Sequence, residues 1–296
     1  MQLHTLDLNF LDTPQVIASY ALVGASSIAL IETGPGSTLP HLLRGLRNLG
    51  AEPGDVREVL LTHIHLDHAG AAGWWARQGA TIYVHAFGAP HLIDPSKLLA
   101  SAQRIYGDQM DYLWGEFLSA PAENVRVVND GDIIAIAGTE INVIETPGHA
   151  RHHHAYRLGE SAFTGDATGV RLLGFDLLAL PSPPPEFDLE AWLITLERLA
   201  ALNLKTIYPT HFGQVTDPAD HLRRFTALLS EATERVRQWM AEGLNRDQII
   251  EQYTAWHLAR AEAAELDAET QERYAKVNHL SMCVDGMMRY WAKRKL

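Results

Sequence analysis

The segment at 60–70, LLTHIHLDHAG, constrains this chain more than any other, because it places three histidines and an aspartate within six residues. A short apolar run, EVLL at 58–61, precedes the cluster and predicts a strand that ends there. Side chains on a loop at a strand end can converge without a helix separating them. The pattern therefore predicts a functional site that contains His63, His65, Asp67 and His68.

Three further predicted strands also end in residues that bind metals. INVIETPGH ends in His149, SAFTGD ends in Asp166 and TIYPTH ends in His211. Imidazole nitrogens and carboxylate oxygens suit zinc, and also iron or manganese, whereas the lack of thiolates argues against a purely structural zinc site. Seven ligands are too many for one tetrahedral ion and about right for two. We expect two divalent metal ions, with zinc preferred to iron or manganese.

The rest of the chain predicts an α/β protein followed by helices. Strand-like runs and helical segments alternate up to about residue 216, and from 217 the chain is helical and charged. We therefore expect a catalytic domain over residues 1–216 and a helical C-terminal extension over residues 217–296. Within the first part, residues 96–119 have helical character, and PSPPP at 181–185 is expected to be a stiff loop.

Composition limits the classes of partner. The formal net charge of −12 argues against a surface built for nucleic acid or anionic lipid. Cys283 is the only cysteine, which excludes an intramolecular disulfide and fits a reducing compartment. The first residues of the sequence do not show a basic start followed by a long apolar stretch, and no run of eighteen apolar residues occurs in it. We expect a small-molecule substrate, no nucleic acid or membrane partner and a cytoplasmic location, and a homo-oligomer is left open.

The H-x-H-x-D-H motif is followed in order by TPGHA, TGD and PTH. This series resembles the metallo-β-lactamase superfamily, in its glyoxalase II-like and lactonase-like branch, over residues 15–215. The resemblance implies an αββα sandwich with the metals at one edge and a helical appendage after it. It also implies a ligand set: His63, His65 and His149 for one metal, Asp67, His68 and His211 for the second, and Asp166 bridging both.

Two residues near the ligands are notable in this comparison. Glu32, in IETGPG, stands where the family usually has aspartate; because that acid is not a ligand in the family, only the support of the ligands is in question. The resemblance places His153, in the run of histidines at 152–154, where a histidine often supports the ligands without binding metal.

The resemblance implies hydrolysis of a small ester, lactone or thioester through a metal-bound hydroxide, because two ions can lower the pKa of a shared water toward ~7. Asp67 and Asp166 would be catalytic by orienting the hydroxide. The competing enzyme is a persulfide-dioxygenase-like protein with one iron on His63, His149 and Asp166. A metal-binding scaffold without catalysis is the alternative outside enzymes, and it is disfavoured because all seven ligands are present.

An aromatic run at 106–117 gives the candidates for substrate binding, namely Tyr106, Tyr112 and Trp114. Packing in the core is the competing interpretation of such a run. We expect this segment and the loop at 181–185 to flank the entrance to the metals, because both interrupt the α/β alternation beside ligand-bearing strands.

Overall fold

The computed structural model describes residues 1–294, and the chain divides into two compact units. The first unit comprises Met1–Glu145 and His152–Thr164, and the second comprises Thr146–Arg151 and the chain from Gly165 onward. The predicted ligands are thus divided between the units. The motif at 63–68 belongs to the first, and His149, Asp166 and His211 belong to the second.

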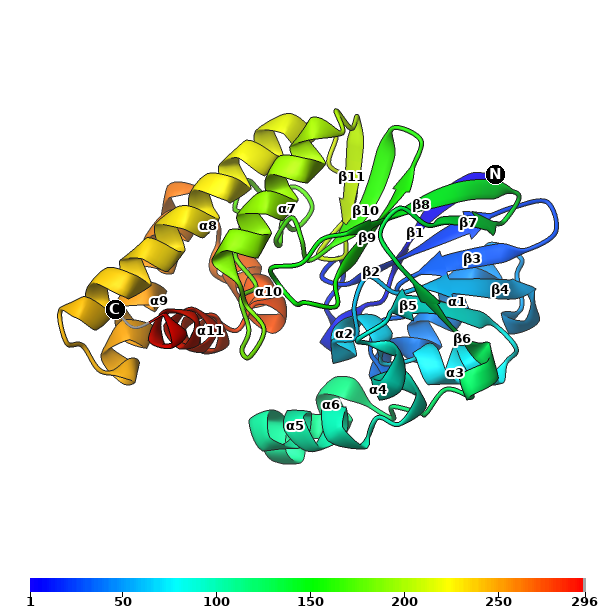
Figure 1. The fold of residues 1–296 in the computed structure, drawn as a ribbon, viewed down its shortest axis with the longest axis horizontal. Coiled ribbons are helices and arrows are strands. Elements are labelled where there is room, and N and C mark those ends of the chain that lie inside the picture. The colour runs from blue at the N-terminus through cyan, green and yellow to red at the C-terminus, as the bar shows by residue number, and fades with distance from the viewer. Residues whose placement is uncertain (295–296) are drawn as a thin grey trace. The chain divides into compact units, whose positions relative to one another are not determined.

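The first unit is built on two sheets (Figure 1). One has the strand order β1-β2-β3-β4-β5-β6, antiparallel from β1 to β3 and parallel from β3 to β6. Strands β2 and β3 form a hairpin, in which Val23 of β2 lies opposite Ile28 of β3. The strands are β1 Gln2–Asp7, β2 Ala18–Val23, β3 Ile28–Ile31, β4 Val56–Leu60, β5 Thr81–His85 and β6 Val125–Val128.

The second sheet of this unit is antiparallel and packs against the first. The strands that this unit contributes to it are β7 Ile133–Ile136, β8 Thr139–Glu145, β9 His154–Leu158 and β10 Ser161–Gly165. The ring centroids of Tyr20 in β2 and Phe163 in β10 lie 5.3 Å apart. The Tyr156 hydroxyl donates to the Leu61 carbonyl at 2.7 Å, so a polar contact also joins the layers. These side chains are fully buried, which places the core between the sheets.

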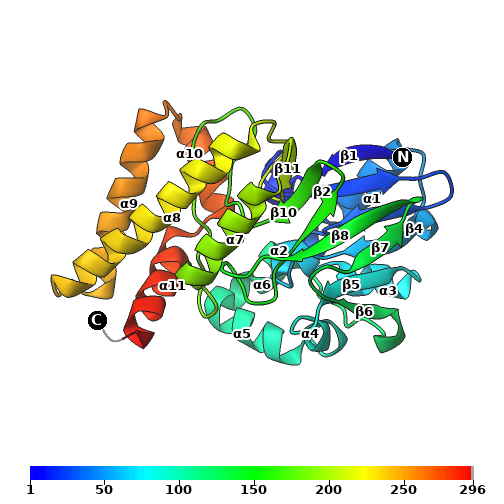
Figure 2. The ribbon, with the colours of Figure 1, turned by 45° about the horizontal axis from the view of Figure 1, so that its top comes forward.

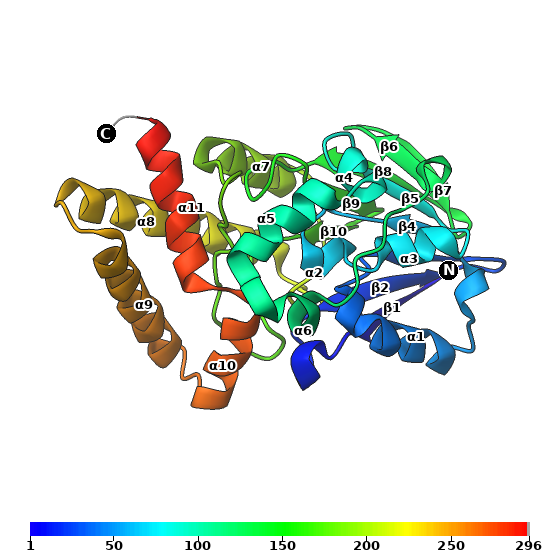
Figure 3. The same ribbon diagram turned by 90° about the horizontal axis from the view of Figure 1, so that it is seen from below.

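Short helices and turns complete the first unit. They are η1 Phe10–Asp12, η2 Gly36–Thr38, α1 Leu39–Asn48, η3 Pro53–Asp55, α2 Leu66–Ala69, α3 Ala72–Arg77, α4 Ala89–Ile93, α5 Ser96–Tyr106, η4 Gly107–Gln109, α6 Met110–Trp114 and η5 Ala122–Asn124. Figure 3 shows α5 and α6 as separate helices. The helical character predicted to residue 119 is wrong beyond Trp114, because Gly115 adopts a φ of +64° that ends the helix.

The second unit is mainly helical. It contains α7 Leu189–Ala201, β11 Thr206–Pro209, α8 Pro218–Ala241, α9 Arg246–Ala263, α10 Ala268–Val277 and α11 Leu280–Lys293. Figure 2 shows α7 beside α8, and α8 and α9 both contact α11. Asp188, Asp217 and Asp267 cap three of these helices by accepting a main-chain N–H three residues on. The helices expected after residue 217 are confirmed, and the division at residue 216 into domains stays a prediction.

None of the helices within residues 1–294 has both the length and the apolar character that crossing a bilayer requires.

Helix α11 lies so close to the loop at 181–185 that only glycine fits at one position. A Cβ atom added to Gly286 would lie 1.9 Å from the main-chain oxygen of Ser182. That oxygen belongs to backbone, which cannot move aside as a flexible side chain can. The close approach therefore fixes α11 against this loop.

We expect Gly286→Ala to lower the free energy of unfolding by about 2 kcal/mol, because overpacking outweighs the gain in helix propensity. Gly45→Ala in α1 is the matched control, since its Cβ would meet only the flexible Leu6 side chain, at 3.3 Å. Thermal midpoints of the two variants test the difference. Equal midpoints would contradict the close packing of α11.

Candidate metal centre

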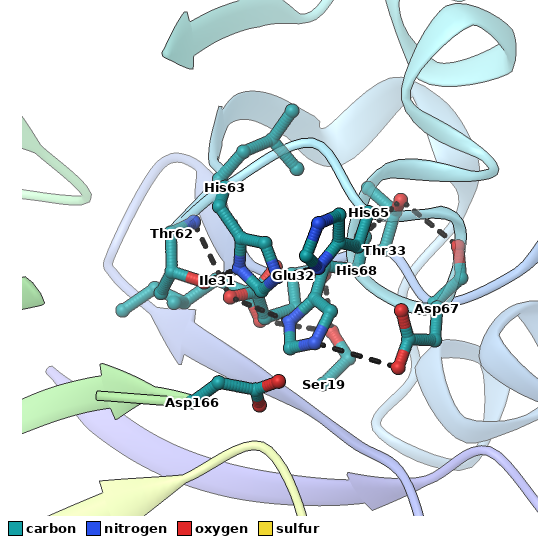
Figure 4. Close-up of polar contacts among 12 residues, drawn as sticks. Ser19, Ile31, Glu32, Thr33, Thr62, His63, His65, Asp67, His68 and Asp166 are labelled. Carbon is teal, nitrogen blue, oxygen red and sulfur yellow. Dashed lines mark hydrogen bonds and ion pairs between the residues drawn. The ribbon is translucent and has the colours of Figure 1, made fainter. Parts of the chain in front are cut away.

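In the first unit, the loop after β4 brings the motif side chains together (Figure 4). His63 Nε2 lies 2.9 Å from His65 Nδ1, and His68 Nε2 lies 3.6 Å from Asp67 Oδ2. The ring centroids of His63 and His68 are 4.0 Å apart. His63 and His68 are fully buried, whereas Asp67 retains 21% side-chain exposure. The structure thus brings these four side chains together, with His65 and Asp67 only partly buried.

The end of β3 holds this loop in place. Thr33 and Gly34 both donate their main-chain N–H to the His68 carbonyl, at 2.9 and 3.1 Å. The Glu32 carboxylate accepts the N–H of Thr62 at 3.2 Å and lies 3.4 Å from His68 Nδ1. The Thr62 hydroxyl in turn lies 3.0 Å from His63 Nδ1. Glu32 therefore contacts both the main chain before the motif and the ring of His68, one of the predicted ligands.

His153 is buried beside the motif. Its ring stacks on His63, with centroids 4.9 Å apart and planes 30° apart. His152 is more distant, with its centroid 6.0 Å from that of His63. This geometry is compatible with the predicted supporting role of His153, which stays a prediction.

In the second unit, a buried carboxylate lies between two histidines. Asp166 Oδ2 is 3.4 Å from His149 Nε2, and Asp166 Oδ1 is 3.5 Å from His211 Nε2. All three residues are at most 3% exposed. Burying a carboxylate is costly unless a cation or hydrogen bonds compensate for it. Two imidazoles facing the two oxygens of one carboxylate are a donor set that suits a divalent metal ion.

The orientation of His149 is fixed by the main chain of the loop at 181–185. Its Nδ1 lies 2.7 Å from the Pro181 carbonyl oxygen. Because a carbonyl only accepts hydrogen bonds, Nδ1 carries a ring proton, which leaves Nε2, the nitrogen nearer Asp166, as the one that a metal ion could bind.

The turn that carries Asp166 is held by two ring nitrogens. Trp192 Nε1 donates to the Ala167 carbonyl at 2.7 Å, and His221 Nε2 lies 2.8 Å from the Thr168 carbonyl. Both side chains are fully buried. Burial lowers the pKa of His221 to about 4, only partly offset by the hydrogen bond to Thr168, so the ring is neutral near pH 7.

The C-terminal helices form hydrogen bonds with the segment at 172–182. This segment contains Pro181, whose carbonyl accepts the hydrogen bond from His149. Tyr274 of α10 accepts the Leu172 N–H at 3.1 Å and donates to the Leu177 carbonyl at 2.7 Å. Cys283 of α11 donates its Sγ–H to the Leu180 carbonyl at 3.1 Å. Burial raises the pKa of this thiol to about 11, which agrees with a structural and not a nucleophilic role.

The aromatic candidates lie in different environments. Trp114 is buried and stacks on Phe10 at 5.7 Å, and its ring meets that of Tyr106 edge to face at 5.0 Å. Burial, with a smaller effect of the Asp67 carboxylate, raises the pKa of Tyr106. Tyr112 is 69% exposed. Packing therefore accounts for Trp114, and the proposed contacts of the three residues with substrate stay predictions.

Several supporting residues were not identified from the sequence. Pro181 acts through its carbonyl, which every residue offers, so no sequence signal was available. Trp192 lies in a segment with leucines at helical spacing, a pattern that indicates core packing and nothing more specific. His221 is a lone histidine outside any motif, and its buried hydrogen bond to Thr168 is structural.

Comparison with known proteins identifies the family of the chain. A model of the Metallo-beta-lactamase superfamily matches residues 12–211, and the chain therefore belongs to the metallo-β-lactamase superfamily. The likeness extends to the C-terminal helices. The crystal structure of the metallo-beta-lactamase family protein TTHA1429 from Thermus thermophilus matches with a TM-score of 0.70 and 22% identity, covering 99% of this chain and 93% of that one. The predicted αββα fold class is confirmed.

Two relatives in sequence extend the comparison. The metallo-beta-lactamase fold-containing protein ST1585 of Sulfurisphaera tokodaii is 24% identical over 228 residues, which is 75% of this chain and 83% of that protein. An atrochrysone carboxyl ACP thioesterase of Aspergillus novofumigatus is 26% identical over 209 residues, which is 69% of this chain. The match spans about half of that thioesterase, 52% of its length.

We expect Tyr274→Phe to loosen the segment at 172–182, because the lost hydroxyl leaves a buried carbonyl and a buried N–H unpaired, at a cost of about 1–3 kcal/mol. Hydrogen–deuterium exchange of residues 172–182 should accelerate. Tyr112→Phe, which alters an exposed ring, serves as the control and should leave this exchange unchanged. Unchanged exchange in both variants would show that α10 does not hold the segment.

The buried neutral His221 predicts acid sensitivity. The unfolded chain gains a proton on this ring near pH 6.5, whereas the folded chain resists protonation until about pH 4. Stability should therefore fall as the pH drops from 6.5 to 4, by at most about 3 kcal/mol from this group. His221→Gln should remove this part of the slope. Urea unfolding in the presence of a chelator, at several pH values, measures the free energy of unfolding of both proteins. If that free energy changes with pH equally in the wild type and in His221→Gln, His221 is not the source of the acid sensitivity.

Proposed function

We propose that the ligand sets of the two units together hold two divalent metal ions and that the chain is a hydrolase of a small ester, lactone or thioester. The observation that carries this proposal is the orientation of His149. Its Nδ1 donates to the Pro181 carbonyl, so Nε2, which lies 3.4 Å from a buried carboxylate, is the nitrogen that a metal ion could bind. Membership of a superfamily that includes thioesterases and β-lactamases supports it.

The ligands are assigned by the match to the family motif. His63, His65 and His149 would hold one ion. Asp67, His68 and His211 would hold the other, and the two oxygens of Asp166, which face different histidines, would serve both. The donor set is made of nitrogen and oxygen atoms only, which suits zinc and also iron or manganese.

Two bound ions would supply a nucleophilic water at neutral pH and a Lewis acid for the carbonyl of the substrate. The two aspartates would orient this water: Asp166 is 3% exposed and lies between two histidines, and Asp67 keeps 21% side-chain exposure. Glu32 keeps His68 oriented through its Nδ1 side, at 3.4 Å. Polar main-chain and side-chain partners of this kind commonly preserve the geometry of metal ligands.

The substrate class rests on chemistry that the superfamily performs and on charge. A thioesterase among the relatives favours an acyl substrate, although only about half of that protein is matched. The net charge of −12 disfavours a polyanion such as nucleic acid. A carbonyl substrate without a high negative charge fits both observations.

The test is elemental analysis of the purified protein beside three variants. We expect two metal ions per chain in the wild type and the loss of at least one in Asp166→Asn, since removing the carboxylate charge leaves two cations to repel each other. His211→Ala should lose one ion, and hydrolysis of lactones and thioesters should fall at least 100-fold in both variants. His41→Ala, in α1, is the control and should keep metal and activity.

A single iron per chain, unchanged in His211→Ala, together with persulfide-dependent oxygen uptake would overturn this proposal in favour of the mononuclear oxygenase. Two metals without hydrolysis of any lactone, thioester, phosphodiester or β-lactam would favour a scaffold instead.

A further inference from the structure

A second group of ligand-type side chains lies within the first unit and shares no residue with the set above. His85 ends β5, Glu145 ends β8 and His154 begins β9. Glu145 and His154 are direct partners across the β8–β9 pair, whereas His85 comes from the other sheet. The three residues therefore join the two layers of the sandwich.

These side chains are close enough to share one ion. One nitrogen of each histidine and one oxygen of the carboxylate all lie within 4.8 Å of one another. His85 Nε2 is 3.2 Å from Glu145 Oε1, and the rings of His85 and His154 have centroids 4.7 Å apart. His85 is 6% exposed, and the Glu145 side chain is 44% exposed, which leaves a route from solvent.

His154 is the unusual member of the group. Its side chain is fully buried, yet neither Nδ1 nor Nε2 has a hydrogen-bond partner in the described part of the chain. Buried polar atoms are almost always paired, because leaving them unpaired costs their full desolvation. Burial also lowers the pKa of His154 to about 3, so its ring is neutral and offers a lone pair.

The electrostatic surroundings favour a cation. Asp130 Oδ1 accepts the Glu145 N–H at 2.8 Å, and both Asp130 and Asp132 raise the pKa of His154, against the larger effects of burial and of His85, which lower it. Three carboxylates thus accompany the two imidazoles.

We propose that His85, Glu145 and His154 form a separate binding site for one divalent cation of the zinc class. Two imidazoles and one carboxylate are a ligand set used by zinc, and they disfavour magnesium and calcium, which prefer oxygen ligands. Three protein ligands leave a fourth position for water. The proposal does not depend on the function proposed above.

One hydrogen bond must change when the cation binds. The Phe87 N–H donates to His85 Nδ1 at 3.0 Å, which places the ring proton on Nε2. Coordination through Nε2 requires this proton on Nδ1 and breaks the bond to Phe87. Losing one hydrogen bond weakens binding about tenfold, a small factor beside the affinity of zinc for such ligands. The bond therefore lowers the affinity without abolishing the site.

The experiment counts zinc ions per chain during competition with a chelator, using the wild type, Glu145→Gln and His154→Leu. The wild type should retain one more ion than either variant. The same difference should persist when all three carry Asp166→Asn, which separates this site from the proposed dinuclear centre. Hydrolytic activity should not change in Glu145→Gln or His154→Leu.

Zinc counts that are identical in the wild type and both variants would overturn the proposal, as would equal competition by magnesium or calcium. In chelator, His154→Leu should match or exceed the thermal midpoint of the wild type, because leucine removes two unpaired nitrogens. If His154→Leu does not fold, Glu145→Gln decides alone, since its side chain is partly exposed and its replacement keeps the shape.

Discussion

The carbonyl oxygen of His68 is the point on which the motif loop depends. It receives main-chain N–H groups from Thr33 and Gly34, and the Thr33 hydroxyl as well. The loop after β4 has no strand ladder of its own, so these bonds to the end of β3 set the positions of four potential ligands. The positions of these four side chains therefore depend on the register of the β2–β3 hairpin. A shift of β3 by one residue would displace the motif with it.

In the second unit, ring nitrogens hold the main chain near His149 and Asp166: they bind the carbonyls of Pro181, Ala167 and Thr168. The loop that carries Pro181 is itself fixed by side chains from about 100 residues later in the chain, as the contact of Cys283 with Leu180 shows. Orientation of the ligands in this unit thus depends on contacts of long sequence separation.

This difference explains what could be predicted from the sequence. The motif and the three later ligands were identifiable because each follows a short apolar strand and has distinctive chemistry. Glu32 was noticeable as a departure from the family. By contrast, Pro181 contributes only a carbonyl, which every residue has. Gly115 ends a helix through its positive φ, and the aromatic residues around it do not predict that backbone angle. The pairing of Glu145 with His154 across two strands required the register of β8 and β9.

The hydrogen bonds between the C-terminal helices and the segment at 172–182 could couple helix packing to metal binding. If helix packing favours the orientation of His149 that binds metal, then metal binding must favour helix packing by the same free energy, because coupling between two equilibria is reciprocal. Tyr274 and Cys283 would then sense occupancy of a centre they do not touch. Protease resistance of α10 and α11 would then report metal loading, and the C-terminal helices would form part of the proposed centre.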